Sequence, residues 1–172
     1  MIFFLLFYFI IRFFLRGLRV PSYGDVLGWT KEGVISFSNY KKDGKQRSYA
    51  GEKWECVEFV RRFLMTTRGI TFDEIDHAYD IFNLSSFQTI DGKRIPIVKN
   101  NKKQYKPERG DVLVWGKDED KNGHVAMVVE TKENGDILIA EQNWENEEWG
   151  DRHYSRIIRV ESEPNLMGWI KI

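Results

Sequence analysis

The sequence has little cysteine, and this scarcity excludes several kinds of protein. Its 172 residues include a single cysteine, so no internal disulfide can form. It contains no Cys-x-x-Cys pair or Cys/His cluster, which gives no sign of a zinc site. A chain of this length can bury an ordinary core without a disulfide or metal, and we expect no cofactor. The lone thiol favours a reducing compartment.

The sequence also lacks an excess of charge of either sign. Basic and acidic residues number 26 each, so no broad basic field for nucleic acid is expected. Residues 1–19 contain three arginines and no acid, which leaves 23 basic and 26 acidic residues in the rest. That mildly acidic body suits a cationic ligand.

Only one apolar run raises the question of a membrane. Residues 2–11 are apolar apart from Tyr8, and Arg12 and Arg16 follow. About 20 apolar residues span a bilayer, but the Arg12 side chain can reach the headgroups and extend a shorter run. We expect residues 1–19 to be a retained hydrophobic membrane-anchor helix; a cleaved signal peptide or a helix docked on the domain are the alternatives. Because the arginines follow the run, residues 20–172 are expected in the cytosol.

The single cysteine, Cys56, lies in the stretch GEKWECVEFVRRFL. Apolar residues recur at helical spacing after it, and Gly69 is a typical helix end. A thiol in the first turn of a helix lies near the positive end of the helix dipole, which favours a nucleophilic thiolate. The alternative from this stretch alone is a buried structural cysteine.

The second half of the sequence predicts mostly strands. We expect strands at residues 111–115, 124–131, 137–143, 155–160 and 168–172, and one at 33–38 before the Cys56 helix. Asn134-Gly135 is typical of a hairpin turn. Residues 73–84 predict a second helix, and residues 41–50 and 91–109 predict loops. N-terminal helices followed by an antiparallel meander define the α+β class.

The predicted hairpin brings His124, at the start of one strand, to the same sheet edge as Glu141, near the end of the next. A β-bulge could shift the pairing by one residue. A cysteine at a helix start, an imidazole and a carboxylate together make a Cys-His-acid site, in which the acid orients the imidazole. His77 and His153 are the weaker candidates for the base.

These residues lie in blocks that resemble the CHAP amidases, cysteine- and histidine-dependent amidohydrolases/peptidases. The likeness is strongest to the amidase domain of glutathionylspermidine and trypanothione synthetase/amidases. It covers Tyr23 to Ile172 and includes the cysteine block, GDVLVW, GHVA and IAEQN. The resemblance implies a papain-like fold (CHAP/NlpC-P60-like). It also implies Cys56 as nucleophile, His124 as base and Glu141 as orienting acid, with substrate contacts at Arg61 and Asn143. Glu55, directly before the nucleophile, is a third candidate for a substrate contact.

The chain departs from the family in two places. Family members commonly have glutamine before the cysteine, where this chain has Glu55, a residue that cannot donate a hydrogen bond when ionised. The chain has no room for an ATP-grasp synthetase, so we expect only hydrolysis. We therefore expect a membrane-anchored thiol amidase that cleaves a glutathionylspermidine-like amide. The alternatives are a peptidoglycan or peptide amidase and a catalytically silent binding module.

Overall fold

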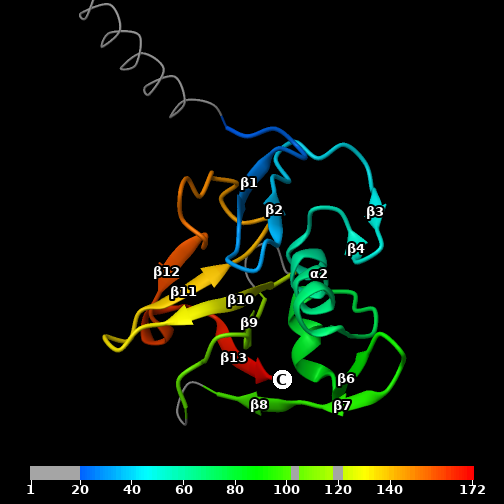
Figure 1. Ribbon diagram of the computed structural model, residues 1–172, viewed down its shortest axis with the longest axis vertical. Coiled ribbons are helices and arrows are strands. Elements are labelled where there is room, and N and C mark those ends of the chain that lie inside the picture. The colour runs from blue at the N-terminus through cyan, green and yellow to red at the C-terminus, as the bar shows by residue number, and fades with distance from the viewer. Residues whose placement is uncertain (1–19, 102–104, 118–121) are drawn as a thin grey trace, which may run out of the picture.

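A computed structural model describes residues 20–101, 105–117 and 122–172 (Figure 1). The strands are β1 (Val26–Trp29), β2 (Ile35–Phe37), β3 (Arg47–Ser48), β4 (Gly51–Glu52), β5 (Ile70–Thr71), β6 (Ser86–Thr89), β7 (Arg94–Pro96), β8 (Val98–Asn100), β9 (Val112–Trp115), β10 (His124–Thr131), β11 (Ile137–Ala140), β12 (Arg156–Ile158) and β13 (Leu166–Lys171). The helices are α2 (Cys56–Arg68) and two short 3-10 helices, η1 (Ala78–Asn83) and η2 (Val160–Ser162). The mixed α+β class is thereby confirmed.

Helix α2 begins at Cys56 and ends at Arg68, as the sequence predicts. Gly69 follows it in the left-handed conformation, with φ 63°, and its N–H bonds back to the carbonyls of Leu64 and Met65. A residue with a side chain is strained at such an angle, so glycine is the natural helix end here. The helix buries its apolar side, including Phe59, which is fully inaccessible to solvent.

The main sheet has six strands in the order β12-β11-β10-β9-β13-β8, and every neighbouring pair is antiparallel. Strands β10 and β11 form the hairpin expected from Asn134-Gly135. Their register shifts between Val128 and Glu130, so the bulge that the sequence left open is present. The bulge interrupts the pairing of β10 with β11 and lies away from the start of β10. There, His124 pairs in regular register with Trp115 of β9.

Alternate residues of the sheet pack into two clusters, as the two-residue period of a strand requires. Val125 and Met127 of β10 join Phe59 and Leu64 of α2 in one cluster. Their neighbours on the strand, such as Ala126, join the other cluster with β11, β12 and β13. Both faces of β10 are therefore buried, which gives the residues at its start a rigid support.

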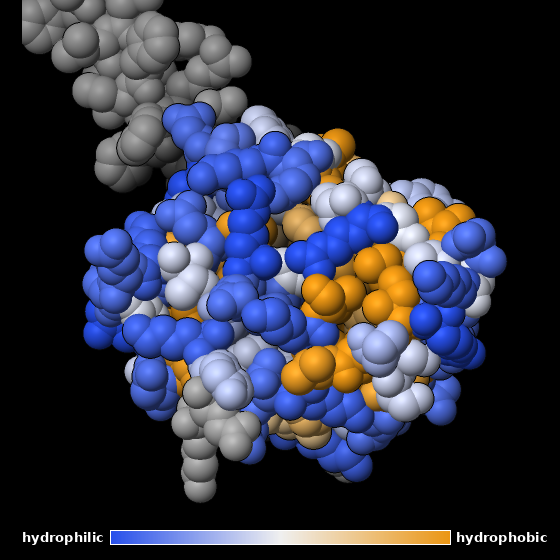
Figure 2. All heavy atoms as spheres, turned by 60° about the horizontal axis from the view of Figure 1, so that its bottom comes forward, coloured by the Kyte–Doolittle hydropathy of each residue, from blue (hydrophilic) through white to orange (hydrophobic). Residues whose placement is uncertain are grey.

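Three predicted segments differ from the structure, and the shortest difference is strand β3 within the predicted loop 41–50. Residues 73–77 are not helical, and only the 3-10 helix η1 forms in the predicted second helix. The segment 91–109 is not all loop, since it contains β7 and β8. Ile95 and Ile97 alternate along this Lys-rich stretch and pack against the core, which explains the strands. Figure 2 views this end of the molecule and shows hydrophobic side chains gathered on part of a mostly hydrophilic face.

The predicted transmembrane helix and the membrane localisation are corrected here. Among the described residues, no helix has both the length and the apolar character needed to cross a bilayer. The segment 1–19, on which the prediction rested, lies outside those residues.

Candidate active site

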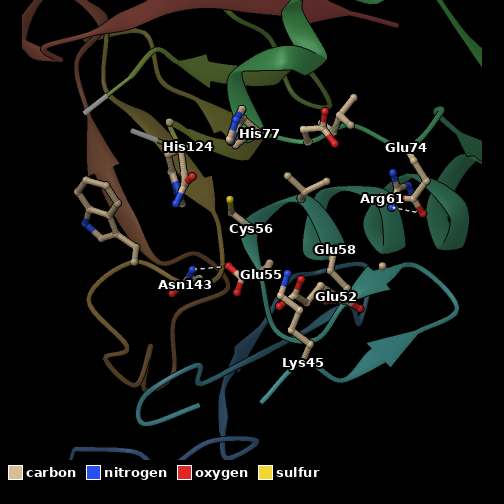
Figure 3. Close-up of a pocket in the computed structure, with 18 of the residues that line it drawn as sticks. Lys45, Glu52, Glu55, Cys56, Glu58, Arg61, Glu74, His77, His124 and Asn143 are labelled. Carbon is tan, nitrogen blue, oxygen red and sulfur yellow. Dashed lines mark hydrogen bonds and ion pairs between the residues drawn. The ribbon is translucent and has the colours of Figure 1, made fainter. Parts of the chain in front are cut away.

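Cys56 is the first residue of α2 and lines a cleft of about 660 Å³. It is a free cysteine, with 7% of its surface exposed. Figure 3 shows Cys56 with the labelled side chains of His124 and Glu55 close by. The N–H groups of the first helical turn have no acceptor within their own helix. The thiol therefore sits beside unused donors at the positive end of the helix dipole.

His124 and Glu141 meet at the edge of the sheet next to this thiol. His124 Nε2 lies 2.9 Å from Glu141 Oε2, and both side chains are almost fully buried. His124 lines the same cleft as Cys56, whose charge and hydrogen bonding raise the pKa of the imidazole. The structure thus brings together the three residues that the sequence singles out as a nucleophile, a base and an orienting acid.

The pKa values of His124 and Glu141 depend on the charged groups around them. Burial lowers the pKa of His124, but the negative charge of Cys56 and its hydrogen bond, together with Glu141, raise it from 6.5 to about 10. Burial raises the pKa of Glu141, but the hydrogen bond and charge of His124, and then Arg156, bring it below its ordinary value. The raised pKa of His124 and the lowered pKa of Glu141 together favour imidazolium beside carboxylate at neutral pH.

Three further side chains that sequence reasoning missed surround the trio. Arg156 Nε donates to Glu141 Oε1 at 2.8 Å, and Ser155 Oγ donates to the same oxygen at 2.9 Å. The Trp144 ring lies 5.0 Å from the His124 ring, centroid to centroid. Ser155 and Arg156 begin the segment 155–160, which the sequence predicts as a strand. Their spacing from Glu141 along the chain does not indicate a contact. The pairing of β11 with β12 brings them there.

Glu55 and Asn143, both predicted as substrate contacts, lie beside Cys56 in the cleft. Asn143 Nδ2 donates to Glu55 Oε2 at 2.6 Å, and Lys42 Nζ donates to Glu55 Oε1 at 2.8 Å. Asn143 has a positive φ of 55°, which asparagine tolerates better than most residues. The Glu55 carboxylate is therefore paired with a cation and held in place by protein groups.

Arg61, the third predicted substrate contact, also lines the cleft but is bound largely by the protein itself. Its Nη1 donates to the Ala50 carbonyl at 2.7 Å, and its Nη2 donates to the Asp73 carbonyl at 3.3 Å. Its guanidinium lies over the Phe72 ring at 4.4 Å. Burial lowers the pKa of Arg61, while the charge of Glu74 opposes that shift. Arg61 thus braces one wall of the cleft.

The other two histidines lie in different places. His77 lines the cleft and stacks on Tyr79, with the rings 5.2 Å apart. His153 lies against the Trp29 carbonyl, at 3.2 Å, and lines a different hollow. His124 is therefore the histidine that pairs with a buried carboxylate.

The cleft has more acidic than basic side chains. Its acidic residues are Glu52, Glu55, Glu58, Glu74, Asp76 and Glu145, and its basic residues are Lys45, Arg47 and Arg61. Most of the carboxylates have cationic partners, but Asp76 and Glu145 are exposed and make no ion pair with any described residue. A cationic group could therefore be held near the cysteine. Within the same part of the chain, no group of His, Cys, Asp and Glu could hold a metal ion.

Comparisons with known proteins place these residues in context. Residues 45–143 match the family model of the CHAP domain. The chain is 32% identical over 139 residues to the bifunctional glutathionylspermidine synthetase/amidase of Escherichia coli (strain K12), covering 70% of this chain and 22% of that protein. It is 28% identical over 159 residues to the trypanothione synthetase of Crithidia fasciculata, covering 86% and 24%. The chain thus spans a quarter or less of the length of these relatives.

Among solved structures, the chain is similar to the wild-type endolysin LysIME-EF1. The TM-score is 0.47 and the identity 17%, over 69% of this chain and 52% of that one. This likeness is too weak to define the fold, which rests on the topology described above.

Proposed function

Because the chain belongs to the CHAP domain family, we propose that it is a cysteine amidase that works through Cys56, His124 and Glu141. The observation that carries the proposal is the 2.9 Å contact of His124 with the buried carboxylate of Glu141, in the cleft that His124 lines together with the Cys56 thiol. We further propose a papain-like arrangement, in which the nucleophile begins α2 and the base begins β10. Residues 20–172 would form the catalytic domain, around the matched residues 45–143.

In the first step, Cys56 Sγ attacks the carbonyl carbon of an amide. The carbonyl oxygen becomes an oxyanion near the start of α2, where the Cys56 N–H has no acceptor within its helix. His124, as imidazolium, gives its proton to the amide nitrogen. The C–N bond then breaks, the amine leaves, and a thioester remains on Cys56.

In the second step, water replaces the amine. The now neutral imidazole takes a proton from water as the oxygen attacks the thioester carbon. The C–S bond breaks, the acid is released, and Cys56 returns to the thiolate beside imidazolium. Glu141 keeps the imidazole oriented throughout and stabilises its charged form.

The substrate that we propose is an amide whose leaving amine is cationic, such as a glutathionylspermidine-like amide. Two relatives are named as glutathionylspermidine or trypanothione synthetases, which supports this class. The charge of the cleft supports it too, because Asp76 and Glu145 lie on its walls without ion pairs to described residues. A polyamine would supply the missing positive charge.

The proposal is tested by incubating the full-length protein with glutathionylspermidine and, separately, with muropeptides. Mass spectrometry then identifies any released amine. We expect free spermidine from the first substrate and none from the Cys56→Ala variant, whose fold is checked by circular dichroism. Cleavage of muropeptides alone would mean that the amidase acts on cell-wall peptides instead of a glutathionylspermidine-like amide. If neither amide is cleaved and Cys56 is alkylated no faster than free cysteine, the amidase proposal fails.

A further inference from the structure

The buried carboxylate of Glu141 has a second charged partner besides the imidazole. Arg156, the first residue of β12, donates from Nε to Oε1 at 2.8 Å and from Nη2 to Oε2 at 3.4 Å. The planar guanidinium thus meets both oxygens of the carboxylate, an arrangement that fixes the plane of a carboxyl group as well as its charge. His124 meets Oε2 at 2.9 Å. Glu141 is therefore clamped between an imidazole and a guanidinium.

The guanidinium is itself held by aromatic rings. It lies 4.5 Å from the centre of the Trp144 ring and 5.6 Å from that of Trp115. The same two rings flank His124, at 5.0 Å and 5.6 Å between centroids. Arg156 also reaches Glu163, at 3.5 Å. With 24% of its side chain exposed, Arg156 is restrained by stacking as well as by ion pairs.

We propose that Arg156 is a positioning residue of the amidase, which sets the orientation of Glu141 and, through it, of the His124 imidazole. This inference rests on the proposed function, because it takes Glu141 as the acid that orients the base. Arg156 holds the carboxylate plane, and the Trp144 ring lies near both Arg156 and His124. A loosened Glu141 would let the imidazole turn away from the thiol.

The positive charge of Arg156 also has a consequence for pH dependence. Two charged groups face Glu141 directly, His124 of β10 and Arg156 of β12. Cys56 of α2 lies beyond His124, and Glu163 lies beyond Arg156. Glu145 and Glu147 also line the hollow next to the carboxylate. Arg156 lowers the pKa of Glu141, after His124. Without this cation, Glu141 takes up its proton at a higher pH, so orientation of the base is lost earlier as the pH falls.

The test compares full-length Arg156→Gln, Arg156→Lys and Arg159→Gln. Arg159 lies three positions further on, and its Nε pairs with Asp136 at 2.9 Å on the exposed surface, so its variant removes the same charge away from Glu141. For each variant, kcat for amide cleavage and the rate of Cys56 alkylation by iodoacetamide are measured across pH. Thermal unfolding checks the fold. Alkylation needs no substrate, so it tests the inference even if the proposed substrate is wrong.

For Arg156→Gln we expect kcat to fall by about 10- to 100-fold, the range seen when outer partners that orient a metal-bound histidine are removed. The acid limb of both pH profiles should move to higher pH. Arg156→Lys keeps the charge but not the two-point contact, so its acid limb should stay in place while kcat recovers only in part. Arg159→Gln should match the wild type in both measurements.

Profiles for Arg156→Gln that coincide with those of Arg159→Gln would overturn the proposal. If Arg156→Gln does not fold, Arg156→Lys decides alone. A wild-type kcat in that variant would overturn the proposal, because one ammonium cannot reproduce the paired bonds to Oε1 and Oε2. A loss of amide cleavage with unchanged alkylation in every variant would also count against it, since the imidazole would then be correctly placed without Arg156.

Discussion

Glu55 and Asn143 are 88 residues apart in the chain, yet Asn143 Nδ2 donates a hydrogen bond of 2.6 Å to Glu55 Oε2 beside the nucleophile. Glu55 directly precedes Cys56, so its carboxylate lies close to where the oxyanion of the reaction would form. Lys42 offsets part of this charge through a bond of 2.8 Å. The site thus carries an acid where related amidases commonly have an amide, and protein groups hold that acid in place.

We predict that Glu55→Gln raises kcat. The amide removes a negative charge next to the developing oxyanion and can donate a hydrogen bond to it. One oxyanion donor is worth a factor of about 100 or more when removed from a preorganised site, so a gain of roughly tenfold is a fair expectation for an added one. The loss of the Lys42 pair should cost about 1 kcal/mol of unfolding free energy or less, because both side chains are partly exposed.

Glu52→Gln is the matched control, because Glu52 is the other carboxylate paired with Lys42 and also lines the cleft. It lies four positions before the nucleophile rather than next to it. Its kcat should stay at the wild-type level. A lower kcat for Glu55→Gln would mean that the carboxylate itself takes part in binding or catalysis.

We predict that Cys56→Ala abolishes cleavage and that His124→Ala lowers kcat by about three orders of magnitude or more. Both changes remove groups that make or break bonds. His77→Ala and His153→Ala should remain close to the wild type, the first although it lines the cleft. Steady-state rates of purified, folded variants decide the matter. A dead His77→Ala enzyme would mean that the base was assigned to the wrong histidine.

Glu141→Gln should be impaired but not inactive, because an amide can still accept a bond from the imidazole. The raised pKa of His124, about 10, depends partly on the hydrogen bond and charge of Glu141. Removing that charge lowers the pKa, so the imidazolium needed to protonate the leaving amine is lost at lower pH. The alkaline limb of the rate should therefore move to lower pH. An unmoved limb would show that Glu141 does not set the charge of His124.

The same pKa has a consequence for stability. A histidine whose pKa rises on folding stabilises the folded state fully below its unfolded pKa of 6.5, and this contribution is lost as the pH rises through about 10. The unfolding free energy of Glu141→Gln should thus differ most from that of the wild type below pH 6.5, and the difference should shrink as the pH rises through about 10. Urea unfolding between pH 6 and about 10.5 measures this trend.

The parts of the site that could be predicted from the sequence are those set by local rules. The helix from Cys56 to Arg68 follows from apolar spacing and the glycine that comes after it, and the hairpin follows from Asn134-Gly135. Hairpin geometry alone then brings the start of β10 near the end of β11. The contact between His124 and Glu141 needs little more than this.

The rest depends on contacts between segments distant in the chain. Arg156 reaches Glu141 because β12 pairs with β11, and Lys42 reaches Glu55 from a polar loop that carries no regular pattern. No period in the sequence reports such contacts. The failed helix at residues 73–77 has the same origin, since Asp73 accepts bonds from Gln88 and Arg94 of the neighbouring strands instead. Tertiary partners there outweigh helical propensity.

We predict that Asp76→Asn and Glu145→Gln each raise KM for a polyamine amide roughly two- to fivefold, because each removes an exposed charge that attracts the cationic amine. Their kcat should change little. The increase should shrink at high salt, where exposed charges are screened. Glu148→Gln is the control, since Glu148 is exposed but does not line the cleft. An unchanged KM in the double variant would remove these carboxylates from the binding site.

A buried ion pair within α2 is hydrogen-bonded to Gln142, the residue that follows Glu141. Arg62 Nε donates to Glu58 Oε1 at 2.8 Å, one helical turn away. Gln142, the residue after Glu141, donates from Nε2 to Glu58 Oε2 at 2.9 Å. Arg62 also donates to the Ile35 carbonyl of β2, at 2.7 Å. The Glu58 side chain is fully inaccessible to solvent, so these donors replace the water that its carboxylate would otherwise bind.

We therefore predict that Arg62→Met destabilises the protein by about 3 to 5 kcal/mol, because it leaves the Glu58 charge buried without its cation. The double variant Glu58→Met/Arg62→Met removes both charges, and it should recover at least about half of that loss. Urea unfolding of the wild type, both single variants and the double variant gives the coupling energy directly. Additive losses would mean that solvent or other groups satisfy Glu58 when Arg62 is gone. A recovered stability with a still lowered kcat would show that this pair also fixes the position of Gln142, and with it the neighbouring Glu141.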